Sequence, residues 1–232
     1  PQTILQGIGD GFDGGANAAL TADPGQQAGA GGGGAFTVPG MAGRSGATRD
    51  KLLKAGGGNT QSEAAVAAGL AWLARKQLKD GSWEFDGISK DKTAATGMAL
   101  LPFLAAGETH KTGKKYKKTV ENGLNWLMSK AGSGGSLGTT NMYAHAIATV
   151  ALCEAAGMTK DPNVKNKATQ AVSFIVHAQG RNGSWGYTGP APTEGDTSIV
   201  GWQIQALASA KLAEIKFEKD KVYKDANKFL ES

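Results

Sequence analysis

The sequence predicts an all-α fold of about three and a half helical hairpins, preceded by a Gly-rich irregular segment. Three segments of the 232-residue chain, 69–83, 123–137 and 171–185, align without a gap. Each combines an amphipathic helical stretch with a turn that reads Gly-Ser-Trp or a degenerate form of it. Self-similarity at a spacing of about 50 residues indicates stacked supersecondary units, each of which buries its apolar face against the next.

The amino-terminal part of the chain differs in composition from the rest. Residues 1–58 hold 17 of the 35 glycines and only scattered large apolar side chains. Such a stretch buries too little apolar surface to offset the entropy of ordering it, so we expect a linker, or an arm that becomes ordered in an assembly. Within it, 48–55 is predicted to form one or two helical turns. The residues that can anchor the arm on a neighbouring surface are Ile4, Ile8, Phe12, Phe36, Val38 and Met41.

Charge and cysteine content exclude several classes of protein. The net charge of +5 is modest and spread along the chain, which argues against a nucleic-acid-binding protein. The single cysteine, Cys153, excludes an internal disulfide framework and a multi-cysteine zinc cluster. No apolar run reaches the roughly 18–20 residues that span a bilayer. Because the chain opens at Pro1 rather than methionine, we expect any targeting segment or membrane anchor to lie outside this sequence.

Each hairpin is predicted to begin with a helix that buries one face. The first such helix covers about 60–76 and has Thr60 or Ser62 as its predicted N-cap. Its apolar stripe has i, i+4, i+7 spacing, which marks one face of a helix. The same stripe recurs in the next two copies: Val66, Leu70 and Leu73; Val120, Leu124 and Leu127; Ala168, Val172 and Ile175.

The first helix of each hairpin is predicted to end in the repeated turn. Glycine at Gly81 and Gly183 permits a positive φ that few other residues tolerate. The tryptophans that follow are expected to pin the turns onto the helices, and Leu137 takes this place in the degenerate copy. The residues predicted to form the structural motif are Gln77, Gly81, Trp83, Gln179, Gly183 and Trp185.

A second helix is predicted after each turn, over 91–106, 141–156 and 196–213. Gly107 and Gly157 are the predicted ends of the first two, and alanine and glycine along these helices favour close approach. The repeat units are therefore 60–107, 115–157 and 163–213, with the start of a fourth at 219–232, and together they form a predicted domain over 59–232.

The motif resembles that of a known superfamily. Trp72-Leu73, three residues, Gln77 and then Gly81-Ser82-Trp83 is similar to the QW motif of squalene and oxidosqualene cyclases, and 174–185 repeats it. Residues 60–232 thus resemble the prenyltransferase and squalene-cyclase repeat superfamily, in particular its uncharacterised bacterial repeat proteins. The resemblance implies a partial α/α toroid, in which inner and outer helices alternate around a ring, and a location in the cell envelope or periplasm.

The resemblance also implies a place for a catalytic acid. Class II terpene cyclases protonate an alkene with the middle aspartate of Asp-x-Asp-Asp-Thr-Ala, and the nearest match here, 89–94, puts Asp91 in that place. Ser89 and Lys92 replace the flanking aspartates, and a lysine neighbour favours the carboxylate over the acid. Asp91 is therefore a weak catalytic candidate, and we expect it to cap the helix that begins there.

Other polar and aromatic residues are candidates for a pocket. Tyr143, Glu194, Asp196 and Trp202 are possible lining residues. Asp196 is also an obvious N-cap that the helix dipole favours. The dense basic group between hairpins is expected to be solvated, with an acidic surface or anionic lipid as the alternative; it comprises Lys111, Lys114, Lys115, Lys117 and Lys118.

No metal or cofactor is predicted. Protein prenyltransferases bind zinc through Asp, Cys and His, but Cys153 follows His145 by eight residues. On a helix this spacing places the two side chains about 80° apart and roughly 12 Å along the axis, so they cannot bind one ion. His110 and His177 lie on other elements.

Taken together, these features favour a non-catalytic structural or protein-interaction module, part of a larger protein or assembly. Its partner is expected to be a protein or a second copy of the chain, bound at the open ends of the toroid. The alternatives are a terpenoid-binding or class II terpene cyclase-like enzyme, and the binding of glycan or another polymer on the concave face. We expect no nucleic-acid partner, and membrane association only through a segment outside this sequence.

Overall fold

The computed structural model describes residues 39–44, 46–87, 89–139, 141–189 and 194–232. Within them the predicted all-α class is confirmed, because they contain helices and no strand. Of the predicted anchors, those before residue 39 lie outside the described residues. The elements are the 3-10 helix η1 (Pro39–Arg44) and the α-helices α2 (Gly46–Ala55), α3 (Thr60–Lys76), α4 (Lys92–Ala105), α5 (Lys117–Lys130), α6 (Met142–Thr159), α7 (Pro162–Ala178), α8 (Thr197–Leu212) and α9 (Lys219–Leu230).

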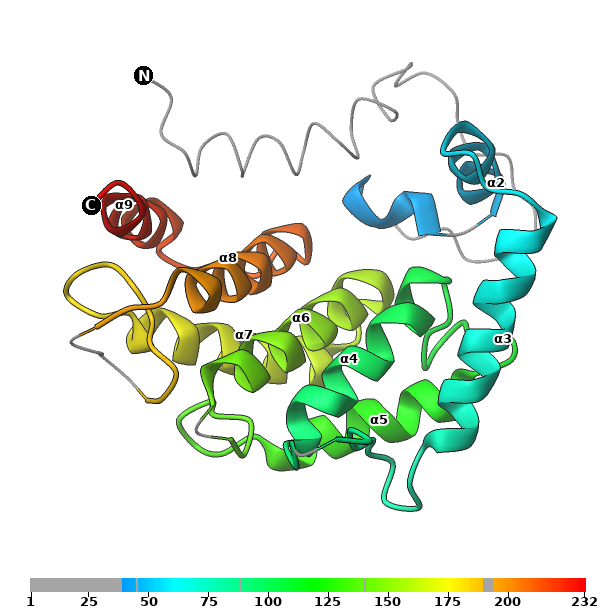
Figure 1. The fold of residues 1–232 in the computed structure, drawn as a ribbon, viewed down its shortest axis with the longest axis horizontal. Helices are drawn as coiled ribbons and strands as arrows, with labels where there is room; N and C mark the ends of the chain where they lie inside the picture. Colours follow the sequence, from blue (N-terminus) through cyan, green and yellow to red (C-terminus); the bar gives the residue numbers. More distant parts are fainter. Residues whose placement is uncertain (1–38, 45, 88, 140, 190–193) are drawn as a thin grey trace.

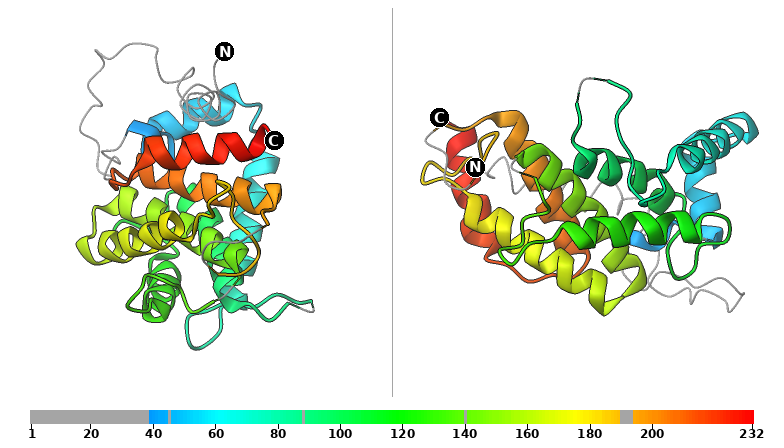
Figure 2. Two further views of the ribbon diagram at one scale, coloured as in Figure 1. Left: turned by 90° about the vertical axis from the view of Figure 1, so that its left-hand side faces the viewer. Right: turned by 90° about the horizontal axis from the view of Figure 1, so that it is seen from below.

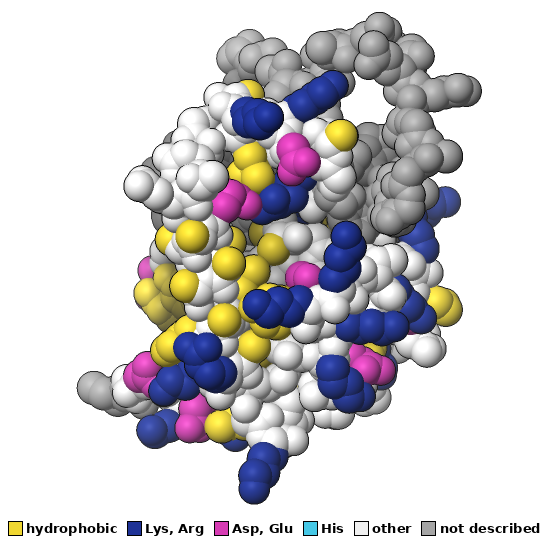
Figure 3. All heavy atoms as spheres, turned by 90° about the vertical axis from the view of Figure 1, so that its right-hand side faces the viewer, with side chains coloured by type: hydrophobic (Ala, Val, Ile, Leu, Met, Phe, Trp, Pro, Cys, Tyr) yellow, Lys and Arg dark blue, Asp and Glu magenta, His cyan; other side chains and the backbone are white. Residues whose placement is uncertain are grey.

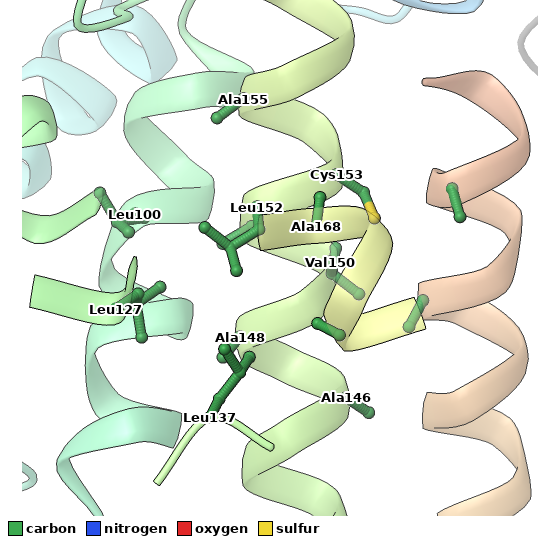
Figure 4. Close-up of a cluster of buried hydrophobic side chains, with 14 of the residues drawn as sticks. Leu100, Leu127, Leu137, Ala146, Ala148, Val150, Leu152, Cys153, Ala155 and Ala168 are labelled. Carbon is green, nitrogen blue, oxygen red and sulfur yellow. The ribbon is translucent and has the colours of Figure 1, made fainter. Parts of the chain in front are cut away.

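The second helices of the hairpins form an inner layer. α4, α6 and α8 lie side by side, and α6, in the middle, packs against both neighbours (Figure 1). The first helices α5 and α7 cover one side of this layer, as the view from below shows (Figure 2). α3 and α9 lie at opposite ends of the arrangement. Nearly all of α6 is buried, and the core around it is shown in Figure 4.

Small residues allow the inner helices to approach closely. A Cβ atom on Gly97 of α4 would lie only 2.9 Å from the Cα atom of Ala148 in α6. Leu152, one turn beyond Ala148, also points toward α4, whereas Val150 points to the opposite side of α6 (Figure 4). The alanines and glycines of the predicted second helices therefore serve helix packing, as expected.

A glutamine connects each complete motif to the next hairpin. The Nε2 of Gln77 donates to the carbonyl oxygen of Gly81 in its own turn and to that of Thr119 in α5, both at 2.9 Å. Gln179 makes the equivalent pair of bonds, to its own turn at 2.9 Å and to Val222 in α9 at 3.0 Å. One amide group thus satisfies two carbonyl oxygens that belong to neighbouring repeats.

The turn glycines have the predicted positive φ, with values of 90° at Gly81, 85° at Gly135 and 87° at Gly183. They also lie directly on the backbone of the next first helix. A Cβ atom on Gly81 would be 2.6 Å from the carbonyl oxygen of Asn122. Side chains at Gly135 and Gly183 would collide with the next helix in the same way, so glycine is required for both conformation and contact.

The motif tryptophans are buried and pin the turns, as predicted. The indole N–H of Trp83 donates to the carbonyl oxygen of Leu73, and that of Trp185 to the carbonyl oxygen of Ile175, each at 2.8 Å. Each bond joins the turn to the last part of the preceding helix. Leu137 is equally buried in the degenerate turn but has no group to donate.

The predicted N-cap of α3 is wrong. Asn59, rather than Thr60 or Ser62, caps the helix, because its Oδ1 accepts from the backbone N–H groups of Gln61 and Ser62. The Ser62 hydroxyl lies 3.0 Å from the Asn59 backbone nitrogen and completes a capping box.

The predicted end of the second helix at Gly157 is also wrong. α6 continues to Thr159 and is followed by Lys160 with a left-handed φ of 53°. Gly157 lies inside the helix, where a Cβ atom would meet the side chain of Met41 at 2.7 Å and Ala213 at 3.3 Å. This glycine therefore serves close packing rather than termination.

The segment before α3 contacts the core. Met41, one of the predicted anchors, is fully buried against α6, and the guanidinium group of Arg44 pairs with the carboxylate of Glu154. Ser209 of α8 also donates to Glu154 at 3.3 Å, so the buried carboxylate is satisfied from two sides. α2 extends over ten residues, somewhat beyond the one or two turns predicted.

We predict that Gly183→Ala lowers the free energy of unfolding by about 2–4 kcal/mol, because it adds left-handed strain and a collision with the Asp225 carbonyl group. Gly201→Ala is the matched control. Gly201 is helical and exposed with open space around it, so alanine there should stabilise by about 0.5–1 kcal/mol. Urea unfolding followed by circular dichroism measures both, and a Gly183→Ala chain as stable as the wild type would contradict the account of the turn.

Candidate functional site

The amino-terminal ends of the second helices meet along one edge, which we call the rim: the N-cap residues Asp91, Asn141 and Asp196 with the residues bonded to them. The backbone N–H of Met142 at the start of α6 donates to the carbonyl oxygen of Tyr187 at 2.9 Å, and the hydroxyl of Thr139, just before α6, donates to Asp91 at 2.8 Å. The three helices therefore begin at the same side of the inner layer.

Asp91 is the N-cap of α4, as predicted. Its Oδ1 accepts from the backbone N–H of Ala94 at 3.0 Å, and its Oδ2 accepts from Thr139. The side chain of Lys92 points toward the preceding Gly-Ser-Trp turn, where its Nζ lies 3.6 Å from a carboxylate oxygen of Asp80. Both carboxylate oxygens of Asp91 thus accept hydrogen bonds, one of them from the first turn of the helix that it caps.

Asp196 is the N-cap of α8, also as predicted, and it joins a small polar group. Hydrogen bonds from Ser198 hold the pKa of the Asp196 carboxyl below its ordinary value. The hydroxyl of Tyr187 donates to Asp196 at 3.1 Å, and this bond raises the pKa of Tyr187. The Tyr143 hydroxyl contacts Ser198, and the rings of Tyr143 and Tyr187 lie 5.8 Å apart.

The four residues predicted to line a pocket are only partly brought together. Tyr143 and Asp196 meet through Ser198 on the rim. Glu194 is exposed nearby, and Trp202 packs against the buried cluster that includes Ile147.

Two pockets lie beside α3, between it and its neighbours α2 and α4. One pocket, of about 550 Å³, is lined by Trp72, Trp83 and Phe85 together with Met98. A second, of about 530 Å³, is lined by residues of α2 and α3, including Val66. Both pockets include Pro102 of α4. We call this groove, with the exposed faces of α3 and α4 beside it, the open edge.

The open edge exposes positions that are buried in the other repeats. Aligning the second helices on their N-caps makes Met98, which is 43% exposed, the counterpart of Ala148 and Gln203, which are both 0% exposed. Pro102 and Ala105 are likewise exposed, whereas their four counterparts are fully buried: Leu152, Leu207, Ala155 and Ala210. In α6 and α8 this face packs against the preceding inner helix. On α4 no preceding inner helix covers it within the described residues.

The same contrast holds for the first helices. Val66 and Trp72 of α3 are 47% and 46% exposed. Their counterparts in α5, Val120 and Trp126, are 0% and 9% exposed. The sequence places Val66 on the apolar stripe of the helix at one open end of the toroid; only the comparison of equivalent positions identifies Met98 and Pro102 as part of the same uncovered surface.

The basic group between hairpins is only partly solvated. The ammonium group of Lys111 lies 2.7 Å from Asp161, the N-cap of α7, and this bond lowers the pKa of the carboxyl. His110 lies 3.3 Å from the same carboxylate, and burial lowers the pKa of its imidazole. Lys118 is highly exposed and pairs with Glu121.

The buried histidine and thiol of α6 are separate from one another. His145 bonds to the carbonyl oxygen of Ala171 at 3.1 Å, and its ring lies 4.5 Å from that of Phe174. Cys153 is buried, which raises the pKa of its thiol. In the part of the chain that the structure describes, no three His, Cys, Asp or Glu side chains gather as a metal site would require. None of the helices described there is long and apolar enough to cross a membrane.

Comparison with known proteins gives no relative from which to assign a function: no protein-family model, curated protein or solved structure matches the chain.

The buried imidazole of His145 predicts acid sensitivity. Burial lowers its pKa from 6.5 to about 4, so the folded state binds this proton less readily than the unfolded state does. Stability from this group is complete above about pH 6.5 and is lost as the pH falls toward 4, by on the order of 3 kcal/mol in all. Urea unfolding of the wild type and of His145→Gln at pH 7 and pH 4.5 measures the difference. The variant should lose less stability on acidification, and an equal loss in both proteins would contradict the assignment.

Proposed function

We propose that this chain is a non-catalytic structural or protein-interaction module whose hairpins form part of an α/α toroid of the prenyltransferase and squalene-cyclase repeat type. The observation that carries the proposal is the open edge. Positions that are fully buried in two repeats are exposed on α4, and they adjoin a groove beside α3. Apolar surface of this kind marks a place where another element binds.

The arrangement of helices supports the toroid. The second helices lie side by side with their amino-terminal ends at the rim, and α5 and α7 lie outside them. Each complete motif turn is bonded to the next first helix, through Gln77 and Gln179. The glycine contact between a turn and the next first helix recurs at all three junctions, at Gly81, Gly135 and Gly183, and repetition of this contact builds a curved array.

The chemistry of Asp91 supports a non-catalytic role. A class II cyclase needs a carboxylic acid strong enough to protonate an alkene, whereas both oxygens of Asp91 already accept hydrogen bonds from Ala94 and Thr139. Asp91 is thus occupied in capping α4 and in holding the segment before α6, which is what a structural role requires.

A terpenoid-binding or cyclase-like protein is the second candidate, and the pocket of about 550 Å³ favours it. Trp72, Phe85 and Met98 give this pocket an apolar and aromatic lining that suits an isoprenoid chain. On the rim, the exposed Tyr187 beside Tyr143 offers aromatic and polar contacts to a glycan, the third candidate.

We predict that the chain does not cyclise squalene or a linear prenyl diphosphate, and that Asp91→Asn changes nothing in this assay, because asparagine also caps a helix. Product analysis by mass spectrometry is the measurement. Product formed by the parent chain and lost in Asp91→Asn would favour the cyclase over the interaction module.

The interaction itself is tested on the protein isolated from its own cells. Native mass spectrometry should give a mass well above the 23.7 kDa of this chain, because the open edge is covered there. A natural protein that is this chain alone and monomeric, with Met98 fully accessible to oxidative footprinting, would contradict the proposal.

A further inference from the structure

The outward face of α3 is apolar although it faces solvent. Residues 64–74 include no charged side chain, and 64–69 are exposed throughout. Helices that are apolar all round are typical of protein interiors. Figure 3, which looks onto this end of the molecule, shows hydrophobic side chains gathered between groups of charged ones. A partner that covers α3 must therefore be largely apolar at its centre.

The residues of α3 are arranged symmetrically about Gly69. Val66 and Trp72, the two large exposed side chains, lie three residues before and after it. Glu63 lies six residues before it, and the basic pair Arg75 and Lys76 lies six and seven residues after it. Gly69 itself has open space where a Cβ atom would be, so a second helix can approach its backbone closely.

We propose that a second copy of this chain covers the open edge, in a two-fold dimer whose α3 helices cross antiparallel at Gly69. The inference rests on the proposed interaction module and names its partner. In this crossing Val66 of each copy lies against Trp72 of the other. Glu63, which pairs with Arg49 of its own chain at 2.7 Å, lies opposite Arg75 and Lys76 of the other copy, so a carboxylate faces basic groups at each end of the crossing.

The pocket at the upper end of the groove receives the partner's tryptophan. Val66, Leu52 and Leu53 line this pocket of about 530 Å³, and they lie at the level that Trp72 of an antiparallel copy reaches. Trp72 is about half exposed in the single chain, and its ring is large enough to act as the anchor of an interface. Glu63 and Arg49 at the pocket rim are the polar border of such a site.

The charges favour this occupant over an unrelated helix. A helix that is acidic at one end and basic at the other is complementary to an antiparallel copy of itself and repels a parallel one. Two-fold dimers, in which one surface binds its own copy, are also the commonest protein oligomers.

Charge reversal tests the crossing directly. Sedimentation equilibrium of the pure wild-type chain should give twice 23.7 kDa at micromolar concentration. Glu63→Lys and the double variant Arg75→Glu/Lys76→Glu should each weaken dimerisation at least tenfold, and their equimolar mixture should restore a dimer because opposite charges then face each other. Lys224→Glu, on the exposed face of α9, is the matched control and should dimerise like the wild type.

Disulfide trapping gives a second readout. Gly69→Cys should form a linked dimer on mild oxidation, because residues at a two-fold axis meet their own copy. Ser62→Cys on the same helix should not, since the two copies of that position lie about 20 Å apart in an antiparallel crossing. The native Cys153 is buried and does not interfere.

The inference is overturned if the wild-type chain stays monomeric at every concentration, if both charge variants dimerise like the wild type, or if Ser62→Cys links as readily as Gly69→Cys. A pure chain that is monomeric, alongside a larger assembly isolated from its own cells, would exclude the second copy while the interaction module stands. A small natural monomer would contradict both proposals.

Discussion

The structure depends on the junction at which each Gly-Ser-Trp turn meets the following first helix. A turn of this kind leaves carbonyl oxygens without intrahelical partners, and one glutamine amide bonds to its own turn and to the next repeat together. Glycine in the turn allows the turn backbone to contact the backbone of the next first helix. The indole N–H of the tryptophan donates a hydrogen bond to the preceding helix. The same residues thus set the conformation of the turn and its contact with the next repeat. The turn and the stacking of repeats therefore depend on each other.

The two ends of the array differ because of this junction. At the carboxyl-terminal end, α9 provides Val222 as the acceptor for Gln179 and buries its own Val222 and Ala226, so the third turn is complete. At the other end, α3 carries a complete turn but exposes the face that its counterparts bury. The degenerate second junction has Ala131 at the glutamine position and retains Gly135, and α5 and α7 remain in contact there. The close contact of the turn glycine is therefore sufficient to hold two hairpins together where both have further neighbours on either side.

Much of this was predictable from sequence because it is local and repeated. The positive φ of the turns, the caps at Asp91 and Asp196 and the all-α class follow from residues close in sequence. The features that the sequence did not predict depend on residues far apart in the chain. Arg44 pairs with Glu154, which lies 110 positions later, and Gly157 allows close packing against Met41 rather than ending the helix. The site was less predictable than the fold, since Met98 looks like any buried apolar residue until its exposure is compared with that of Ala148.

The central claim is that each motif glutamine holds the next hairpin, and hydrogen–deuterium exchange on two variants tests it most directly. Gln179→Leu removes the bonds to Gly183 and Val222, so amide protection should fall in α9 and remain unchanged in α5. Gln77→Leu should do the reverse, with protection falling in α5 and retained in α9. If each variant weakens α5 and α9 equally, or neither variant changes the exchange of its own neighbouring helix, the glutamines are not the connection between repeats.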